Sequence, residues 1–388
     1  MREVMITGIG STPYGKIEGK GVESLAVAAA SQALARSGVD RGDIGAVYLG
    51  NFAGGPLAGQ EVLAGMVADD LGLTGGIPCT KVEGACASGG IAFRHAVLMV
   101  ATGQVEAALV IGTEKMTAAS NSQVTQALNY AMDNRAEGPS GLTFPGLFGL
   151  AWRLHAERYG TTRDEISSVL IKNKANGLKN PLAQMGASLT PDVIRQSAMI
   201  ADPLQLYDCC PVSDGAAAVV VTTAERAKGA PDLPIRVRAA VQTSGPARIA
   251  GHEDLCSFLT TRRAAERAFA AAGIKPGDLD LAEIHDCFSM AEVIHSEDLG
   301  LVPRGMGAKW AAEGRTKVGG DIAINASGGL LSKGHPVGAT GVGQIYEVVM
   351  QLRGQHGNQV GNARLGLSQN VGGAGVACTV SILERSDA

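Results

Sequence analysis

The segment Ala33-Leu-Ala-Arg-Ser-Gly-Val-Asp-Arg-Gly-Asp-Ile44 returns later in the chain as Ala268-Phe-Ala-Ala-Ala-Gly-Ile-Lys-Pro-Gly-Asp-Leu279. The first residues and the last residues of the two copies are both 235 positions apart (268 − 33 and 279 − 44). Stretches rich in alanine and glycine can match by chance, but a constant spacing along the whole segment makes chance a poor explanation. Each copy is typical of the end of a helix, a turn and the start of a strand.

A second pair of segments extends the similarity. Ala87-Ser-Gly-Gly90 matches Ala326-Ser-Gly-Gly329, and a predicted helix and strand follow each copy, the strands over 107–112 and 363–368. Two blocks with the same order of elements indicate an internal duplication of one α/β unit. We therefore expect an α/β protein of two halves, residues 1–229 and residues 230–388.

An insert interrupts the first half. Strands over 3–9 and 46–49 and a helix over 22–37 open this half. Between the predicted strands over 107–112 and 216–222 lie roughly a hundred residues of different composition, which is too many for a loop. The sequence predicts an inserted loop subdomain at about 115–207, and such segments over a rigid α/β scaffold usually carry substrate contacts.

The composition excludes several classes of function. The 388 residues carry a net charge of −4, with 45% hydrophobic and 18% charged residues, which indicates a folded chain with ample material for a core. A nucleic-acid binder would show a basic stripe and a membrane protein an apolar run of about 18 residues, and the sequence shows neither. Seven cysteines in a long chain are expected as free thiols in a reducing compartment, so we expect a cytoplasmic protein.

Cys86 lies in Val82-Glu-Gly-Ala-Cys-Ala-Ser-Gly-Gly90, after a predicted strand and before a predicted helix over 91–101. A cysteine at a strand-to-helix turn faces the positive end of the helix dipole, which favours the thiolate. The glycines let a substrate approach the backbone, and unpaired N–H groups at the helix start could hold an oxyanion. Because free cysteines are so often interior, a small buried cysteine is the alternative.

The counterpart of this segment in the second half is Asn325-Ala-Ser-Gly-Gly-Leu-Leu-Ser-Lys-Gly-His335-Pro-Val-Gly-Ala-Thr-Gly341. In a duplicated α/β fold, corresponding strand ends meet near a pseudo-twofold axis, so we expect Cys86 and His335 to face one another. A thiol beside an imidazole is the usual means of activating a cysteine nucleophile. A lone histidine is more often structural, and the placement opposite Cys86 is what makes His335 a candidate.

A third cluster, Glu283-Ile-His-Asp-Cys-Phe-Ser289, follows an apolar stretch over 279–284. A turn must present His285, Asp286 and Cys287, because three consecutive residues do not face one way on regular structure. The Cys287 thiol could be a general acid/base. Zinc is the competing idea, but no Cys or His stands at the usual ligand spacing, so we expect no metal on this chain.

Together these motifs resemble the thiolase superfamily, in particular its sterol-carrier-protein-type and archaeal-type branch. The matching segments are Cys86-x-Ser-Gly, His285-Asp-Cys-Phe, Gly334-His-Pro-x-Gly-Ala-Thr-Gly, Gly112-Thr-Glu-Lys-Met, Asn180-Pro-Leu-Ala-Gln, Ala201-Asp-Pro-Leu and Cys210-Pro-Val-Ser-Asp-Gly-Ala-Ala-Ala. The similarity spans essentially the whole chain. It implies the duplicated thiolase fold, with five layers in the order αβαβα, and a dimeric CoA-dependent acyltransferase.

The resemblance also implies roles for individual residues. Cys86 would accept the acyl group, and His335 would activate it and help to bind the thioester oxygen. His285 stands where many thiolases have an asparagine. Asn370 stands where they have the acid/base cysteine, so Cys287 is the natural substitute for it.

The implied function is thiolytic cleavage of a 3-oxoacyl-CoA, or the reverse Claisen condensation, in lipid or aromatic acid degradation, with coenzyme A as a substrate. The backbone amides of Cys86 and Gly372 would form the second oxyanion hole. The short insert around 138–150 resembles thiolases that work beside a small zinc-ribbon/OB-fold subunit, and a homodimer is also implied. Two rivals remain, a carbon–carbon lyase (retro-aldolase) of the same fold and a non-catalytic scaffold subunit of an acyl-CoA complex.

Two smaller features have ordinary explanations. Lys172, Lys174 and Lys179 could contact CoA phosphates, but a solvated helix face is the simpler account. Cys210 and the cysteine before it are expected to pack beside Asp214.

Overall fold

The structure is a computed structural model of the chain that describes residues 1–73 and 75–386. Its strands form one ten-stranded sheet, in the order β10-β9-β11-β12-β8-β1-β7-β4-β2-β3, and a separate hairpin of β5 and β6. The strands are β1 Val4–Ser11, β2 Ile44–Gly50, β3 Cys79–Val82, β4 Ala107–Glu114, β5 Met199–Ala201, β6 Leu204–Gln205, β7 Gly215–Thr223, β8 Ile235–Ser244, β9 Leu281–Glu283, β10 Ala323–Ile324, β11 Leu365–Gly372 and β12 Ala377–Arg385.

The large sheet consists of two five-stranded halves joined at β1 and β8, which pair only through Met5–Arg236 and Ile6–Ile235. From the junction outward, one half runs β1, β7, β4, β2, β3 and the other runs β8, β12, β11, β9, β10. We number the strands of each half one to five along the chain, leaving out the hairpin. From the junction outward, both halves then have the order one, five, four, two, three. One arrangement built twice confirms the duplication. Our proposed division after residue 229 falls between α8 (Ala224–Ala227) and β8.

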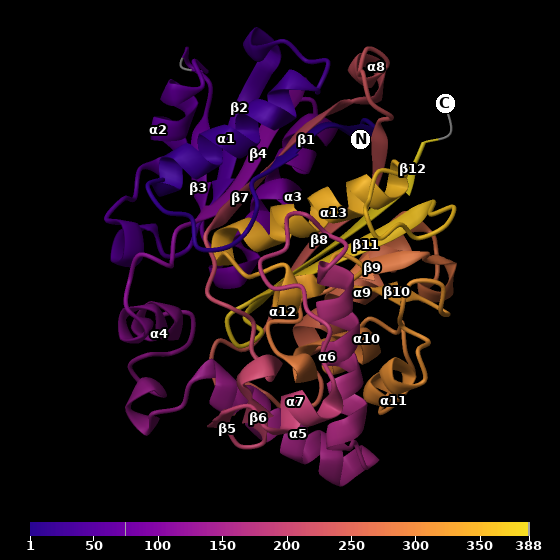
Figure 1. The fold of residues 1–388 in the computed structure, drawn as a ribbon. Coiled ribbons are helices and arrows are strands. Elements are labelled where there is room, and N and C mark those ends of the chain that lie inside the picture. The colour runs from indigo at the N-terminus through magenta and orange to yellow at the C-terminus, as the bar shows by residue number, and fades with distance from the viewer. Residues whose placement is uncertain (74, 387–388) are drawn as a thin grey trace.

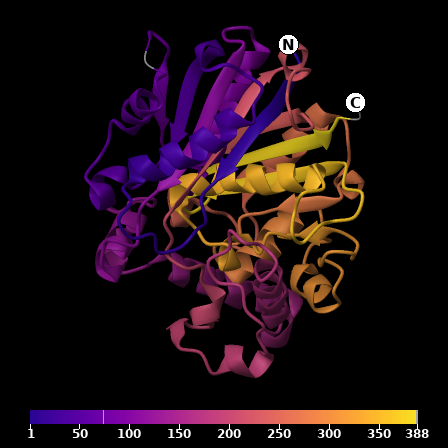
Figure 2. The ribbon, with the colours of Figure 1, turned by 45° about the horizontal axis from the view of Figure 1, so that its top comes forward.

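Helices form three layers around the two half-sheets (Figure 1 and Figure 2). On the outside, α1 (Val22–Ala35) and α2 (Leu63–Asp70) pack on the first half, and α9 (Leu259–Ala272) packs on the second. Between the halves lie α3 (Ser88–Ala101) and α13 (Thr340–Leu352), which share one apolar core with strands of both. The layers therefore run α, β, α, β, α, and the predicted fold class is confirmed.

Glycines allow α1 to pack directly on β1. A Cβ atom at Gly8 would stand 2.1 Å from the Ala33 carbonyl oxygen, and one at Gly10 would stand 2.1 Å from the Ala29 carbonyl oxygen. Only glycine fits at these two positions, and four of the buried residues of α1 are alanines, Ala26, Ala29, Ala30 and Ala33. The small residues of the sequence thus bring the layers close together.

The second half departs from the first after β10. In the first half a 3₁₀ turn at Ala85–Ala87 leads into α3, and its counterpart at Val337–Ala339 leads into α13. An additional short helix, α12 (Gly329–Ser332), stands between β10 and the second turn. The predicted equivalence of 87–90 with 326–329 is therefore wrong in detail, because 326–329 lead into α12 instead of the long central helix.

The segment between β4 and β7 forms the insert. It contains α4 (Asn121–Asn129), α5 (Phe144–Tyr159), α6 (Arg163–Gly177), α7 (Pro191–Arg195) and the β5–β6 hairpin. Helix α6 packs against α10 (Ser289–Asp298), α11 (Gly307–Ala312) and α12, so this part of the insert lies on the second half (Figure 1). Within residues 1–73 and 75–386, none of the helices combines the length and the apolar character that a membrane crossing requires.

Candidate active site

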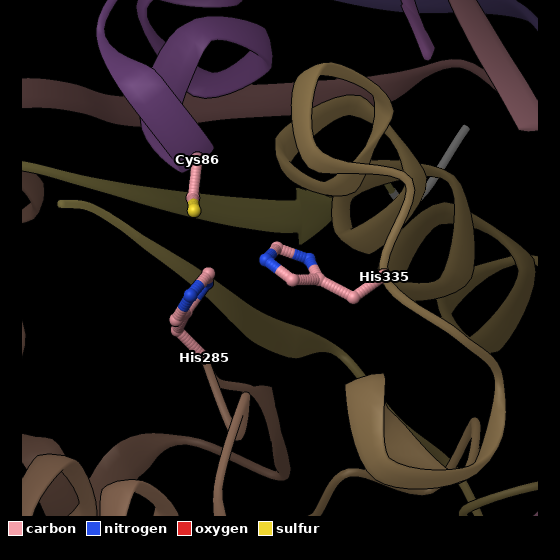
Figure 3. Close-up of side chains that lie close together, drawn as sticks. All are labelled: Cys86, His285 and His335. Carbon is pink, nitrogen blue, oxygen red and sulfur yellow. The ribbon is translucent and has the colours of Figure 1, made fainter. Parts of the chain in front are cut away.

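Cys86, His285 and His335 converge on one point in the interior of the molecule (Figure 3). Cys86 lies in the 3₁₀ turn before α3, His285 follows β9, and His335 precedes the turn that leads into α13. The Cys86 Sγ and one nitrogen of each imidazole lie within 4.8 Å of one another. The two imidazole rings meet edge to face, with their centroids 5.1 Å apart. Both halves of the duplication thus contribute side chains to one cluster.

Local hydrogen bonds hold the turn that presents Cys86. Ser88 Oγ accepts a hydrogen bond from the Gly84 N–H at 3.0 Å and donates one to the Ala85 carbonyl at 2.6 Å. Ala85 has a left-handed backbone with φ of 51°, which is uncommon for a residue with a side chain. Backbone strain of this kind persists where its surroundings enforce it, and it is frequent at functional sites.

Burial dominates the electrostatics of the Cys86 thiol. It raises the pKa of this thiol to about 12, although a hydrogen bond from the Gly373 N–H acts in the opposite direction. The sequence favours a thiolate at the head of a helix, but here desolvation outweighs the helix dipole. The thiol is therefore protonated at neutral pH, and its proton must pass to a base before the sulfur can attack a substrate.

Both imidazoles are neutral at pH 7. Burial lowers the pKa of His335 to about 3, and burial together with the neighbouring His335 places the pKa of His285 well below its usual value. The His335 backbone N–H donates to Ser213 Oγ at 3.0 Å, and the His285 backbone N–H donates to Gln369 Oε1 at 2.8 Å. A neutral imidazole can accept a proton at one nitrogen while it donates a hydrogen bond from the other.

Cys287 borders this cluster. Its carbonyl accepts a hydrogen bond from the Cys210 N–H at 3.0 Å, where the segments around 209 and 288 form a short antiparallel bridge. Burial raises the pKa of the Cys287 thiol well above its usual value, and the nearby Cys210 and Cys86 thiols raise it further. A second thiol, Cys210, therefore lies directly opposite Cys287.

The position of Cys210 differs from the expected one beside Asp214. The Asp214 carboxylate is occupied by the Lys115 ammonium at 2.5 Å, the Thr117 hydroxyl at 2.6 Å and the Met116 N–H at 2.7 Å. This network takes up the surroundings of Asp214. The bridge to the Cys287 segment, which connects residues distant in sequence, places Cys210 at the candidate site instead.

Gly372, at the end of β11, lies against the turn that holds Cys86. A Cβ atom at Gly372 would stand 2.2 Å from the Gly84 carbonyl oxygen, so only glycine lets the strand come this close. The backbone N–H that reaches the Cys86 sulfur belongs to the next residue, Gly373. The amides of Cys86 and Gly372 remain our proposal for an oxyanion site, and Gly373 joins them.

Two lysines of α6 are buried, contrary to the sequence-based expectation. Lys172 Nζ lies 3.0 Å from a Glu292 carboxylate oxygen, and Lys174 Nζ donates to the Leu331 carbonyl at 2.6 Å. Burial lowers the pKa of Lys174 to about 8. A solvated helix face is wrong for these two ammonium groups, because each is held by partners in the second half of the chain. A contact to CoA phosphates stays a prediction.

Sequence reasoning also missed the groups that support His285. Asn173 donates to the Asp286 carboxylate at 2.8 Å, and the same carboxylate accepts the Leu330 N–H at 2.6 Å. Because Asp286 directly follows His285, these bonds fix the turn that presents the imidazole. The signal available in the sequence is the pair of amides at Asn173 and Asn176, placed inside a helix where amides are unfavourable without a partner.

Cys86, His285 and His335 are also residue types that bind Zn²⁺, and three such ligands with an open fourth position are typical of catalytic zinc sites. A metal held there would occupy the electron pairs that thiol chemistry needs. The absence of a metal from this chain stays a prediction, which metal analysis of the purified protein tests.

Family models match both halves of the chain. The family described as "Thiolase, N-terminal domain" matches residues 4–225, and the family described as "Thiolase C-terminal domain-like" matches residues 242–385. The two matches together span most of the sequence.

Three curated relatives align over nearly the whole chain. An acetyl-CoA acetyltransferase of Methanothermobacter thermautotrophicus is 41% identical, with 99% of this chain and 100% of the relative covered. The benzoylsuccinyl-CoA thiolase subunit BbsB of Thauera aromatica is 35% identical over 91% of this chain and 90% of the relative. Sterol carrier protein 2 of Gallus gallus is 34% identical over 98% of this chain and 71% of the relative.

The solved structure of the Ltp2-ChsH2(DUF35) aldolase superposes with a TM-score of 0.84 and 25% sequence identity, covering 98% of this chain and 97% of the other. The fold described above is therefore shared with both acyl-transferring and carbon–carbon-cleaving proteins, and the chemistry has to be argued from the site.

Proposed function

The chain belongs to the thiolase family and is an acyltransferase of the thiolase type; we propose that it cleaves a 3-oxoacyl-CoA with coenzyme A, or runs the reverse Claisen condensation, through an acyl group on Cys86. One observation carries the proposal: a thiol and two neutral imidazoles from opposite halves of the chain lie within 4.8 Å of one another. A nucleophile beside a base is the requirement for covalent acyl transfer.

In the first step the Cys86 thiol gives its proton to His335. The sulfur then attacks the 3-keto carbon, and the carbonyl oxygen takes up the electron pair of the C=O π bond. When the carbonyl reforms, the bond between the 2-carbon and the 3-carbon breaks and its electron pair remains on the departing acyl-CoA as an enolate. Hydrogen-bond donors around that oxygen lower the barrier, and this is the role we give to His285.

In the second step the enolate takes a proton at its α-carbon from the Cys287 thiol and leaves as acetyl-CoA, while the shortened acyl group stays on Cys86. Coenzyme A enters, its thiol gives its proton to the Cys287 thiolate, and its sulfur attacks the thioester on Cys86. The tetrahedral oxyanion would be held by backbone N–H groups, for which we propose those of Cys86 and Gly372. Collapse of this intermediate transfers the acyl group to coenzyme A and frees the Cys86 sulfur.

The substrate class that we propose is a 3-oxoacyl-CoA from lipid or aromatic acid degradation. The name of BbsB supports a test with a bulky aromatic acyl chain, and the name of the archaeal relative supports a test with a short one. All seven cysteines are free thiols, which suits work in a reducing cytoplasm.

We also propose a homodimer and a small zinc-ribbon/OB-fold partner that helps to hold coenzyme A. The two-component name of the DUF35 complex and the word subunit in the name of BbsB support a partner. So does the surface of the insert, where Leu150, Met199, Ile200 and Leu206 are all exposed. We call these four residues the insert patch. Their segments adjoin, because Gly149 packs against the carbonyls of residues 201 and 202, and the Leu206 N–H donates to the Ala198 carbonyl at 2.8 Å. Exposed apolar groups gathered in one place mark interaction sites.

The decisive experiment is mass spectrometry of the chain after incubation with acetyl-CoA. An acetyl adduct on the Cys86 peptide, lost in Cys86→Ala, supports the thiolase. Because the DUF35 complex is an aldolase, a retro-aldolase reaction is the second candidate, and it needs no covalent cysteine. Release of an aldehyde or ketone from a 3-hydroxyacyl-CoA, with no adduct, would establish the lyase. If no adduct and no product form, a non-catalytic scaffold subunit is the remaining explanation.

A further inference from the structure

The two histidines of the site face the same sulfur, but their other ring nitrogens have different partners. His335 Nδ1 lies 2.7 Å from Thr340 Oγ1, and His285 Nδ1 lies 3.3 Å from Asn370 Nδ2. Both rings are neutral, so each carries its single N–H hydrogen on one of two nitrogens. The partner of Nδ1 decides which nitrogen that is.

Thr340 acts on His335 as an acceptor. Its hydroxyl also contacts the Pro336 carbonyl at 3.0 Å, one helical turn back. A hydroxyl has one hydrogen, and a carbonyl can only accept, so both contacts are satisfied when the hydroxyl donates to Pro336 and accepts from the imidazole. His335 then carries its hydrogen on Nδ1, and its Nε2 has a free electron pair.

Asn370 acts on His285 as a donor. Its Oδ1 accepts the Gly90 N–H at 3.4 Å, which fixes the orientation of the amide and turns its NH₂ group toward His285. The amide fits because Gly341 has no side chain, since a Cβ atom there would stand 2.3 Å from Asn370 Oδ1. An NH₂ group can only donate, so His285 accepts at Nδ1 and carries its hydrogen on Nε2.

We propose that Thr340 and Asn370 are positioning residues that hold His335 and His285 in opposite tautomers. Thr340 leaves His335 Nε2 bare, so that it can take the Cys86 proton. Asn370 leaves His285 Nε2 protonated, so that it can donate to the thioester or enolate oxygen. This inference rests on the function proposed above, and it explains how two chemically identical rings perform a base role and a donor role side by side.

The proton balance follows from this arrangement. When the Cys86 S–H bond breaks, its hydrogen passes to His335 Nε2, and the ring becomes an imidazolium whose Nδ1–H still donates to Thr340. His285 exchanges no proton, and its Nε2–H stays on nitrogen throughout while the oxygen in front of it gains and loses charge. Cys86 returns to the thiol when the acyl group leaves for coenzyme A and His335 gives the proton back.

The first test is ¹⁵N NMR of the full chain with histidine labelled at both ring nitrogens, without any acyl-CoA. Protonated and bare ring nitrogens have well separated shifts, and His285→Gln and His335→Gln assign the two rings by loss of signal. We expect hydrogen on Nδ1 of His335 and on Nε2 of His285. The same tautomer in both rings would overturn the proposal. Because no acyl-CoA is present, this result is independent of acyl-enzyme formation, so the proposed function can fail while the tautomers stand.

The second test uses variants of nearly equal size. Thr340→Val removes the acceptor and should slow acylation of Cys86 by about 10²-fold or more, the contribution of a general base. Thr340→Ser restores the hydroxyl and should recover most of that rate. A Thr340→Ser variant as slow as Thr340→Val would show that the methyl group and its packing matter instead, and would overturn the role of Thr340.

Asn370→Asp replaces a donor by an acceptor while it keeps the oxygen that Gly90 needs. We expect hydrogen to appear on His285 Nδ1 in the NMR spectrum and acyl transfer to slow by about 10²-fold, the effect of losing an oxyanion donor. Alkylation of Cys86 by iodoacetamide does not pass through an oxyanion, so the rate of alkylation should change far less in this variant than the rate of acyl transfer. An unchanged His285 spectrum in Asn370→Asp would overturn the role of Asn370.

Discussion

The Glu114 carboxylate accepts a hydrogen bond from the Gly338 N–H at 3.0 Å, although 224 positions separate the two residues. The same carboxylate accepts the Phe52 N–H at 3.0 Å, the Ala53 N–H at 3.1 Å and the Asn51 amide at 2.7 Å. One side chain at the end of β4 thus connects the half that carries Cys86 to the turn that follows His335.

Glu114→Gln should therefore weaken both the fold and the site. An amide has a single acceptor oxygen, so the change leaves buried N–H groups facing an NH₂ group. Each unsatisfied donor costs about 1–3 kcal/mol, so we expect urea unfolding to show a loss of about 2 kcal/mol or more. Glu106→Gln is the control, because it removes only surface ion pairs, with Arg2 and Arg226, and solvent screens such pairs so that they contribute little. Equal losses in the two variants would contradict the connecting role of Glu114.

Cys86→Ala should abolish acyl-enzyme formation and turnover while the protein stays folded. Loss of a nucleophile commonly costs on the order of 10⁴-fold or more in rate. The matched control is Cys79→Ala, which removes another partly exposed thiol, on β3, outside the cluster. Turnover of Cys86→Ala within tenfold of the parent would make Cys86 a structural residue.

Cys287→Ser should still form the acyl-enzyme from acetyl-CoA but should fail to exchange hydrogen at the α-carbon. Deuterium uptake by acetyl-CoA from heavy water measures this step, because exchange requires an acid/base near the carbon. Cys210→Ser is the control, since Cys210 is the thiol opposite Cys287 and our mechanism gives it no role. If Cys210→Ser stops exchange and Cys287→Ser does not, the acid/base is assigned to the wrong thiol.

Acid stability should depend on Glu347, a buried carboxylate of α13 next to Lys333 at 2.6 Å and His356 at 2.9 Å. Burial alone would raise its pKa, but the two cations outweigh burial and hold the pKa at about 2. A lowered folded pKa contributes stability above the unfolded value of about 4.3, and this stability is lost as the pH falls toward 2.

In urea unfolding at several pH values, the stability that the parent loses between pH 5 and pH 2 should be smaller in Glu347→Gln, by about 3 kcal/mol at most. Glu266→Gln, at an exposed position of α9, is the control and should follow the parent. Parallel curves for all three proteins would rule out Glu347 as a source of acid sensitivity.

The partner proposal predicts that the chain alone has a high KM for coenzyme A. Co-expression with a zinc-ribbon/OB-fold protein from the same operon should lower that KM. A double change in the insert patch, Leu150→Glu with Ile200→Glu, should abolish co-purification, whereas Val62→Glu, at an exposed apolar position outside the insert, should not. Tight binding of coenzyme A by the isolated chain would remove the need for a partner.

The fold could be predicted from the sequence because the duplication left a direct trace. The repeated segments ending at Ile44 and Leu279 both lead into the second strand of a half-sheet, β2 and β9. A match of only four residues was a less reliable guide to which segments of the two halves correspond. Four residues at 326–329 look like the start of α3, but the inserted α12 shifts the true counterpart to the turn before α13.

Part of the candidate site could be predicted from the sequence. Cys86, His285 and His335 stand in recognisable motifs, but the positions of Lys172 and Asn370 depend on partners far along the chain. A helix with lysines and asparagines has the pattern of a solvated surface, and only the acceptors that the second half supplies make its burial possible. The role of Asn370 required two hydrogen bonds to residues in different motifs.

The buried polar side chains of α6 limit how a new substrate specificity can be engineered. Asn173 and Asn176 on this helix hydrogen-bond to Asp286 and to the Asn325 carbonyl, so part of the insert serves as scaffold for the second half. A chimera that exchanges the whole insert with that of a relative would break those bonds as well as replace the loops that we expect to contact the substrate. Grafts that end before Arg163 and resume after Gly177 keep the helix native, and they separate the change of substrate from damage to the imidazole that follows β9.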